Sequence, residues 1–285
     1  MNLKHALMAM GLLGMTGGLG QGVGAAPITF NTALPLSDGE VIVREQVHYT
    51  KASDVVGGMD RQLKLWKSIT ALGYGVNEKL AVFAAIPLID KDMKFGGDSD
   101  SDSGLADMKI FARYRLYGKD GPGQTTRIGA FAGLNLPTGK FGQTGDGSTD
   151  VWGGLVITHA STRWSYDGQI KYTANGAHNG FARGDSRSAN LALQYRINRP
   201  HENVQMNGFL YTVLEGEIVY AERDKMAGVK NLNSGGTTAF IAPGLQYATK
   251  RWIGEAAVKI PVVRDLHGTA LQPGATLILS SRFNF

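Results

Sequence analysis

The sequence contains no cysteine, and this absence removes two kinds of structure at once. Without thiols the chain can form neither a disulfide framework nor a thiolate metal site. A strong excess of one charge is also missing, because 29 Lys and Arg residues are balanced by 24 Asp and Glu residues. Removing residues 1–25 removes only Lys4 and leaves 28 against 24, a formal charge of +4. So small and dispersed an excess argues against nucleic-acid binding.

Long apolar runs are absent from residues 26–285, where 18 consecutive apolar residues never occur. This excludes membrane-spanning helices in that region. Proline is rare, at 9 of 285 residues, whereas glycine is frequent, at 39. Together with a hydrophobic content of 43%, these counts are typical of many strands joined by turns and not of a disordered chain. Two classes remain, an exported soluble β protein and a membrane β-barrel.

Residues 1–25 have the pattern of a secretory signal peptide. Lys4 provides the positive start, residues 6–20 form an apolar stretch, and Val23-Gly24-Ala25 places small residues at a cleavage site. The alternative is a short membrane anchor, but the stretch is below the ~20 residues of a spanning helix and glycine interrupts it. We therefore predict a mature chain beginning near Ala26 and a single domain over residues 26–285.

Apolar and polar side chains alternate along most of this domain. Near the carboxy terminus, the odd positions from Ala275 to Phe285 are mainly apolar and the even positions are mainly polar. A period of two predicts a strand with one apolar and one polar face. Such a strand ending on an aromatic residue resembles the assembly signature of Gram-negative outer-membrane proteins. Strands are predicted over residues 40–51, 62–74, 79–88, 105–117, 126–137, 150–159, 164–174, 188–197, 204–222, 236–247, 252–262 and 271–285.

The links between these segments alternate between long and short. Outer-membrane barrels have an even number of strands, short periplasmic turns and longer outer loops. Their sheets close because every backbone polar group in hydrocarbon needs a partner within the protein. We therefore predict an all-β fold, an antiparallel transmembrane β-barrel of about 12 strands, in the outer membrane of a Gram-negative bacterium. The predicted long outer loops are residues 52–61, 89–104, 138–149, 175–187 and 223–235.

Three features bear on how the strands face the membrane. Several aromatic residues fall near predicted strand ends, as in interfacial girdles, although strand propensity alone also favours aromatics. They are Trp66, Trp152, Trp164, Trp252, Tyr117, Tyr220 and Tyr247. Lys67 shares a face with Leu65 and Ile69, which predicts a bulge or an interfacial position for that lysine. Segment 150–159 is apolar on both faces, so its orientation stays open.

Four stretches of the chain have a recognisable sequence: Leu134-Asn-Leu-Pro-Thr-Gly-Lys140, residues 104–115 with Arg113-Tyr-Arg115, Ala242-Pro-Gly-Leu-Gln-Tyr247 and Ala256-Ala-Val-Lys-Ile-Pro-Val262. Together they resemble one family of outer-membrane proteins, described as "putative MetA-pathway of phenol degradation". The resemblance covers residues from about Leu34 to the carboxy terminus. It implies a barrel of the transporter type, linked to the metabolism of aromatic compounds. It implies no catalytic residue.

Polar strand faces turned inward would line the lumen with charge. The candidate basic ring, in the periplasmic half, consists of Arg44, Arg113, Arg115, Arg127, Arg196 and Arg282. Other candidate lumen charges are Lys171, Glu215, Glu217, Glu255 and Lys259. Such a ring would attract anionic solutes such as aromatic carboxylates. The alternative is that charges at strand ends are merely solvated.

Other chemistries fit poorly. Asp98, Asp100 and Asp102 resemble the start of a calcium loop, but the sixth and twelfth positions hold Ser103 and Lys109, not the required glycine and acid. An ester or lipid hydrolase would need a nucleophile with an oriented base. Histidine lies near a polar residue at His159 with Ser161 and at His178 with Asn179, in or beside loops, and no nucleophile elbow is present. We predict no catalytic residue, cofactor or metal.

The sequence therefore predicts an outer-membrane channel for passive uptake of small molecules, and only the resemblance suggests hydrophobic or aromatic ones. The alternatives are a closed structural or adhesive barrel whose outer loops bind partners, and an outer-membrane hydrolase. The expected partners are outer-membrane lipid and lipopolysaccharide, the barrel-assembly machinery and a small-molecule solute. Whether the pore is open or plugged is not set by the sequence.

Overall fold

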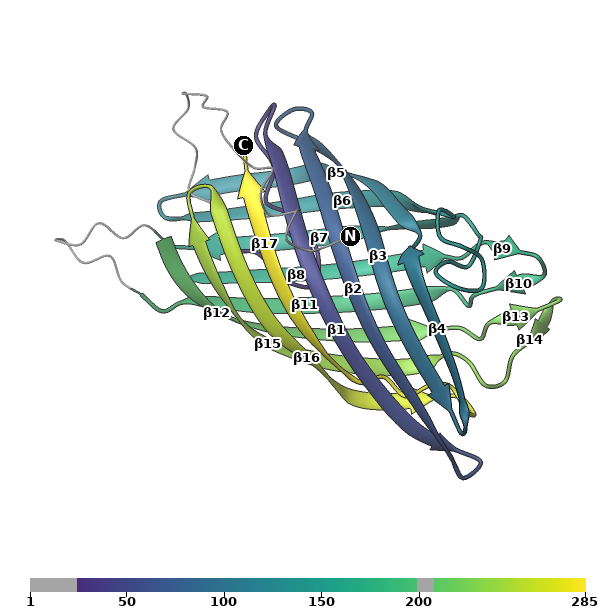
Figure 1. The fold of residues 1–285 in the computed structure, drawn as a ribbon. Helices are drawn as coiled ribbons and strands as arrows, with labels where there is room; N and C mark the ends of the chain where they lie inside the picture. Colours follow the sequence, from purple (N-terminus) through teal and green to yellow (C-terminus); the bar gives the residue numbers. More distant parts are fainter. Residues whose placement is uncertain (1–24, 199–207) are drawn as a thin grey trace.

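Twelve antiparallel strands close into one barrel in the computed structural model, which describes residues 25–198 and 208–285 (Figure 1). The signal peptide predicted over residues 1–25 lies outside the described residues, apart from Ala25. Pairing of β1 with both β2 and β17, and of β2 with β3, completes the ring. The predicted fold and strand number are thus confirmed. The barrel strands are β1 (Val41–Val56), β2 (Met59–Gly75), β3 (Leu80–Phe95), β5 (Met108–Gly121), β6 (Gln124–Leu136), β7 (Asp150–Ser161), β8 (Trp164–Ala174), β11 (Ser186–Arg196), β12 (Gly208–Ala221), β15 (Gly236–Thr249), β16 (Trp252–Leu266) and β17 (Ala275–Asn284).

The outer wall of the barrel is apolar and the inner wall is polar. On β8, Tyr166 and Ile170 are exposed on the outside, whereas Asp167 and Gln169 are buried inside. On β17, exposed Leu277 and Leu279 face outward in the same way. This pattern matches an acyl-chain environment outside and a polar lumen inside, the arrangement of outer-membrane barrels. Among the described residues, no helix is long and apolar enough to cross a membrane.

Strand β2 faces the opposite way from the sequence-based expectation. Lys67 pairs with inward-facing His48, while neighbouring Trp66 pairs with Tyr49 on the outer wall. Trp66 and Tyr49 are in ring contact, with centroids 4.5 Å apart. The predicted bulge or interfacial position for Lys67 is therefore wrong, because the pairing continues without a register shift. Both faces of β2 carry apolar residues, and the pairing partner, not the alternation, sets its orientation.

Two of the predicted long loops are strands instead. β1 and β2 continue through residues 52–61 and turn at Gly57-Gly58, where both glycines have positive φ, 59° and 81°. Two-residue hairpin turns favour this backbone conformation, which glycine adopts without a Cβ clash. β3 likewise continues to Phe95 and returns as β4 (Asp98–Leu105). The acidic stretch 98–103 is therefore part of a strand and not an open loop.

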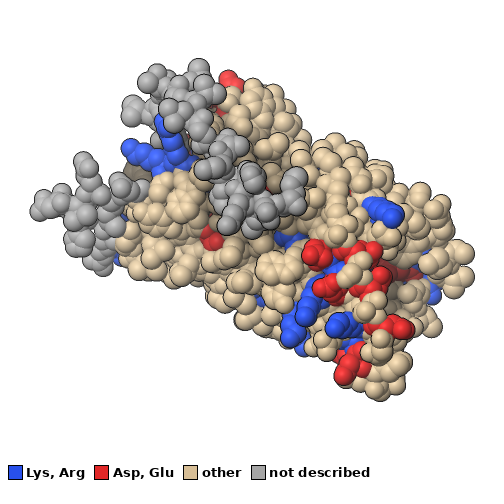
Figure 2. Space-filling model, viewed as in Figure 1, with Lys and Arg blue, Asp and Glu red and all other residues tan. Residues whose placement is uncertain are grey.

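These extensions make one side of the barrel taller than the rest. Beyond Lys51, β1 pairs only with β2, and β4 pairs only with β3 among the described residues. The outward positions of this extension include Lys64, Asp90, Asp92 and Lys94 as well as Val55, so its outer face is mainly charged. Figure 2 shows acidic and basic side chains gathered over this end of the molecule. We call β4 and the parts of β1–β3 beside it the overhang. Its charged face places it beyond the hydrocarbon layer.

The remaining outer connections are long, as predicted. The 175–185 and 222–235 connections contribute a small sheet, and the 137–149 connection is fixed to the break between β4 and β5. There Asp107 accepts hydrogen bonds from the backbone N–H groups of Gly139 (2.9 Å) and Asp146 (3.1 Å). The small sheet consists of β9 (Ala177–His178), β10 (Phe181–Ala182), β13 (Lys225–Met226) and β14 (Val229–Lys230).

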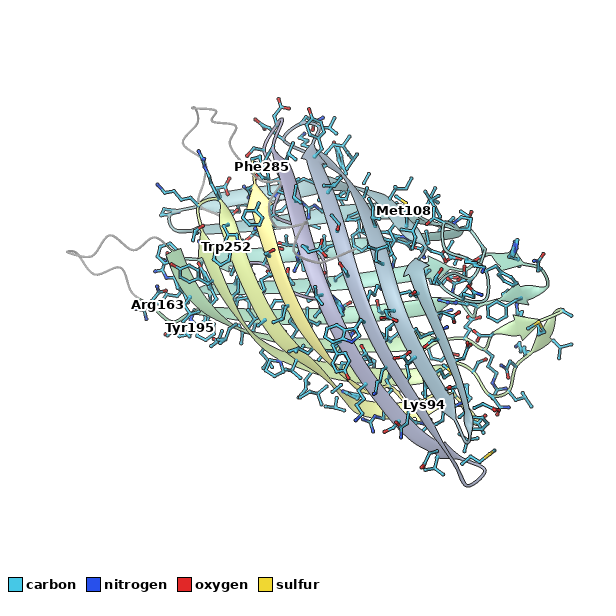
Figure 3. All side chains as sticks on the ribbon, viewed as in Figure 1. Lys94, Met108, Arg163, Tyr195, Trp252 and Phe285 are labelled. Atoms are coloured by element: carbon cyan, nitrogen blue, oxygen red, sulfur yellow. The ribbon has the colours of Figure 1, made fainter. Side chains whose placement is uncertain are left out.

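Aromatic side chains surround the outer wall near both ends. Trp164 contacts Tyr195 at 4.5 Å and Tyr247 contacts Trp252 at 6.0 Å, near the end that holds the short hairpins and Phe285 (Figure 3). Trp66, Tyr117 and Tyr220 are also exposed outside. Trp152 was predicted as a girdle residue, and that prediction is wrong. Its side chain faces the lumen and is 8% exposed, because β7 turns Val151, Leu155 and Ile157 outward.

One acidic side chain interrupts the apolar outer wall. Glu45 faces outward from β1, and Ser68 and Thr70 of β2 donate hydrogen bonds to its two carboxylate oxygens at 2.5 and 2.6 Å. A carboxylate turned toward hydrocarbon is costly unless its acceptors are satisfied. The two hydroxyl groups reduce that cost.

Candidate functional site

The amino-terminal end of the described chain lies inside the barrel. Residues 25–36, which we call the plug, cross the lumen from one wall to the other. Ile28 packs in a buried cluster with Val213, Ala257 and Ile278. Further along, Ala33 packs with Phe131, Trp152 and Val156 on the opposite wall. The plug is thus anchored by apolar contacts at both sides of the lumen.

Acidic and amide side chains of the wall bind the plug backbone. Glu215 accepts hydrogen bonds from the N–H groups of Ile28 (2.5 Å) and Thr29 (3.1 Å), and from the Thr29 hydroxyl group. Gln246 both accepts from Ala26 N–H and donates to Ala26 O, at 3.3 and 3.0 Å. Each such bond satisfies a backbone group that is shielded from water.

Basic side chains bind the carbonyl oxygens of the plug. Arg44 donates to Ile28 O at 2.9 Å and forms a salt bridge with Glu255 at 2.6 Å. Arg113 is 8% exposed and donates to two plug carbonyls, Thr32 O at 2.6 Å and Leu34 O at 2.7 Å. These charge-assisted bonds are among the stronger contacts in the lumen.

Cavities border the plug on both of its sides. Towards the outer loops, a cavity of about 270 Å³ has Ile28 and Asn31 in its floor; we call it the vestibule. Towards the short hairpins, a second cavity beside Arg113 and Arg115 measures about 10 Å³, about the size of one water molecule.

Aromatic side chains form one wall of the vestibule. Phe111 stacks on Phe83 with a centroid distance of 4.5 Å and contacts Trp152 at 5.2 Å. Gly133 lies between Phe111 and Trp152 in the sheet. A Cβ atom at Gly133 would lie 2.5 Å from Phe111 Cβ and 2.7 Å from the Trp152 ring. The missing side chain therefore allows the two rings to meet.

This close approach gives a stability prediction. Gly133→Val should lower the free energy of unfolding by about 1–3 kcal/mol, because overpacking forces backbone or rings to shift. Thermal unfolding followed by heat-modifiable mobility of the detergent-solubilised barrel measures the change. Gly216→Val is the matched control, since nothing lies within 4 Å of a Cβ atom there. Equal unfolding midpoints for the two variants would contradict the packing argument.

All eleven charged residues proposed from the sequence lie on the inner wall, and most are engaged within the protein. Arg44 and Arg113 hold the plug, as described above. Arg127 pairs with Asp120 at 2.8 Å, and the Arg196 guanidinium lies 4.7 Å from the Phe209 ring. The Arg115 guanidinium lies 3.8 Å from a carboxylate oxygen of Glu78. Arg282 on β17 is paired with Ile253 on the neighbouring strand β16. A role of these arginines in attracting anions stays a prediction.

The second group of proposed charges divides between plug and vestibule. Glu215 and Glu255 belong to the plug contacts. Glu217 pairs with Lys259, and Lys171 lines the vestibule. Sequence reasoning missed Lys109, Phe111 and Trp152 as site residues. The polar–apolar alternation could have placed Lys109 inside, whereas nothing local assigns Trp152 to the lumen.

The histidine pairs considered for hydrolysis do not meet a serine. His159 Nδ1 lies 2.8 Å from Thr126 Oγ1 on the outer face, and Ser161 contacts its own turn at Trp164. His178 packs edge-on against Phe141. Across residues 25–198 and 208–285, no cluster of three His, Asp or Glu side chains could hold a metal ion.

Comparison with known structures finds similarities at low sequence identity. The crystal structure of the COG4313 outer membrane channel from Pseudomonas putida F1 has a TM-score of 0.67 and 16% identity, over 92% of this chain and 100% of that one. The CymD monoaromatic hydrocarbon channel has a TM-score of 0.40 and 11% identity, over 87% and 88% of the two chains. A Pseudomonas aeruginosa FadL homologue has a TM-score of 0.39 and 9% identity, over 86% and 89%.

The first of these similarities establishes the barrel fold, and the other two are too distant to carry an argument. No curated protein has a sequence that matches the chain. The sequence profile of one family matches residues 48–276, which is most of the barrel. The chain therefore belongs to the family described as "Putative MetA-pathway of phenol degradation".

Proposed function

We propose that the protein is an outer-membrane channel for passive uptake of small molecules, hydrophobic or aromatic ones included. The observation that supports this most directly is the vestibule of about 270 Å³ above a plug that is held by side chains and not by strand pairing. An extended segment bound through side chains can leave without opening the sheet. A lumen closed in this way suits a solute path that opens when the plug moves.

Two further observations support an aromatic solute. The vestibule wall contains Phe111 and Trp152, which offer ring faces and edges to a ligand. The COG4313 protein is described as an outer membrane channel, and the family name refers to phenol degradation. Neither name identifies the solute of this chain.

Flux measurements test the proposal. Proteoliposomes containing the purified full chain should admit small neutral aromatic solutes faster than protein-free liposomes do. Suitable solutes are derivatives of benzyl alcohol that are too polar to cross lipid unaided. Planar bilayers should show discrete conductance steps in the same preparation. Conductance and flux that stay at the protein-free level would instead support a closed structural or adhesive barrel.

A further inference from the structure

The vestibule wall combines aromatic rings with cations. Lys109 on β5 and Lys171 on β8 both line the vestibule, on the same side as Phe111 and Trp152. Lys171 Nζ lies 5.9 Å from the centroid of the Trp152 ring. The strand register places these residues in adjacent rows, since Phe111 and Trp152 face Gly133 while Lys171 faces Gly154. The aromatic rings of Phe111 and Trp152 thus form a surface that has ammonium groups at its border.

These two ammonium groups are not part of a salt bridge with any described residue. Neither Lys109 nor Lys171 has a carboxylate within 4 Å in the described parts of the chain, unlike Lys259, which is paired with Glu217. Asp150, the acidic group near Lys109, is held by Ser148, Asn135 and Gly176 at 2.8–3.0 Å. The charged residues that line the vestibule are Arg44, Lys109 and Lys171 on the basic side and Glu217 on the acidic side, so the lining carries a formal excess of positive charge.

A buried polar atom at the same wall also lacks a partner. Trp152 Nε1 is inaccessible to solvent and has no hydrogen-bond acceptor among the residues that the structure describes. An unsatisfied buried donor is unfavourable and calls for a partner such as a buried water molecule.

From this combination we propose that the vestibule is a binding site for a one-ring aromatic carboxylate. The aromatic ring packs against Phe111 and Trp152, and the carboxylate lies between the ammonium groups of Lys109 and Lys171. The cavity volume of about 270 Å³ lies below the ~300–1,000 Å³ of sites for drug-sized ligands, so it suits a single ring. This inference rests on the proposed channel function and names the class of solute that the channel would concentrate at its outer side.

Among ligands that carry the same aromatic ring, the site should select by the charge of the substituent. Benzoate gains both the ring contact and the charge-assisted bonds. Benzyl alcohol keeps only the ring contact, and benzylamine is repelled by the two lysines. Solvent-screened ion pairs contribute little each, so two of them predict about a tenfold preference for benzoate over benzyl alcohol.

Isothermal titration calorimetry on the full chain in a non-ionic detergent, with benzoate, benzyl alcohol and benzylamine as probes, tests this prediction. Benzoate should bind with the lowest Kd, and the double variant Lys109→Gln/Lys171→Gln should weaken benzoate binding about tenfold and benzyl alcohol binding less. Lys51→Gln/Lys64→Gln is the matched control. It removes the same charge from two lysines that are paired across β1 and β2 on the outer face of the overhang.

Two results would overturn the inference. One is equal affinity for benzoate and benzyl alcohol in the unmodified chain. The other is an equal loss of benzoate affinity in both double variants, which would show a non-specific charge effect. Flux of neutral solutes in the same preparation tests the proposed channel separately. Flux without benzoate preference would reject only the site, and absent flux with selective binding would reject only the channel.

Discussion

A cross-link between the plug and the barrel wall is expected to abolish solute flux. Thr32 on the plug and Thr158 on β7 have hydroxyl oxygens 3.0 Å apart. Sulfur atoms in these positions would lie within reach of a disulfide after small side-chain rotations. The double variant Thr32→Cys/Thr158→Cys should therefore form one bond under oxidising conditions. Because the chain has no cysteine, no other thiol can compete.

Flux through proteoliposomes should fall to the protein-free level after oxidation and return after reduction with a phosphine. The physical reason is that a covalently fixed plug cannot leave the lumen, which it crosses from the Ile28 cluster on one wall to the Ala33 cluster on the other. Each single cysteine variant serves as a control and should conduct with or without oxidant. Full flux through a completely cross-linked sample would show that solutes pass without movement of the plug.

Loss of the carboxylate that holds the plug should have the opposite effect. Glu215→Ala removes the acceptor of three hydrogen bonds, from Ile28 N–H, Thr29 N–H and the Thr29 hydroxyl group. Hydrogen bonds to a charged group contribute about 1.5–3 kcal/mol each, less the gain from solvation of the freed groups. A net loss of about 3 kcal/mol would raise the ratio of open to closed barrels roughly 100-fold.

Single-channel recording measures this ratio as the open probability. Glu217→Ala is a close control, because Glu217 lies two residues along the same strand and face but pairs with Lys259 and not with the plug. Its open probability should stay close to that of the unmodified chain. If both variants open equally often, general loosening of the lumen explains the change, and the plug contacts of Glu215 are not the latch.

The barrel itself was largely predictable because its driving force is local. On β5, β6, β8 and β17, the alternation of polar and apolar residues indicates which face is outer and which is inner. The register is strongly specified there, because a shift by one residue would move every side chain to the other face of the wall. The prediction was wrong where both faces are apolar, as at Lys67 on β2. Segment 150–159 has no clear alternation either, and for that reason Trp152 was predicted on the outer wall although it faces the lumen. In these strands the neighbouring strand decides the register.

Contacts between distant parts of the chain were beyond local reasoning. The plug depends on Glu215 and Gln246, about 190 and 220 residues further along the chain. The prediction also did not use the turn at Gly57-Gly58. Because these glycines form a tight turn, residues 52–61 are the end of a long hairpin and not a loop. Pro87 and Pro261 lie within β3 and β16, although proline has no N–H group to donate to a strand ladder. Pro87 lies where the pairing of β3 passes from β5 to β4, so its missing donor costs little there.

In the overhang, β4 has a strand edge that is unpaired within the described residues. The sequence along this edge affects how barrels interact when they are crowded in the membrane. Along β4, one row of backbone groups pairs with β3, and the described residues offer no strand to the other row. Such an edge can recruit the same edge of a neighbouring molecule and start aggregation. Asp98, Asp100 and Asp102 recur along it at every second position, and Asp102 is paired with Lys91 at 2.8 Å. Two copies brought together there would bring Asp98 and Asp100 of one copy close to those of the other, so densely packed barrels should repel one another at the point where their sheets could most easily join.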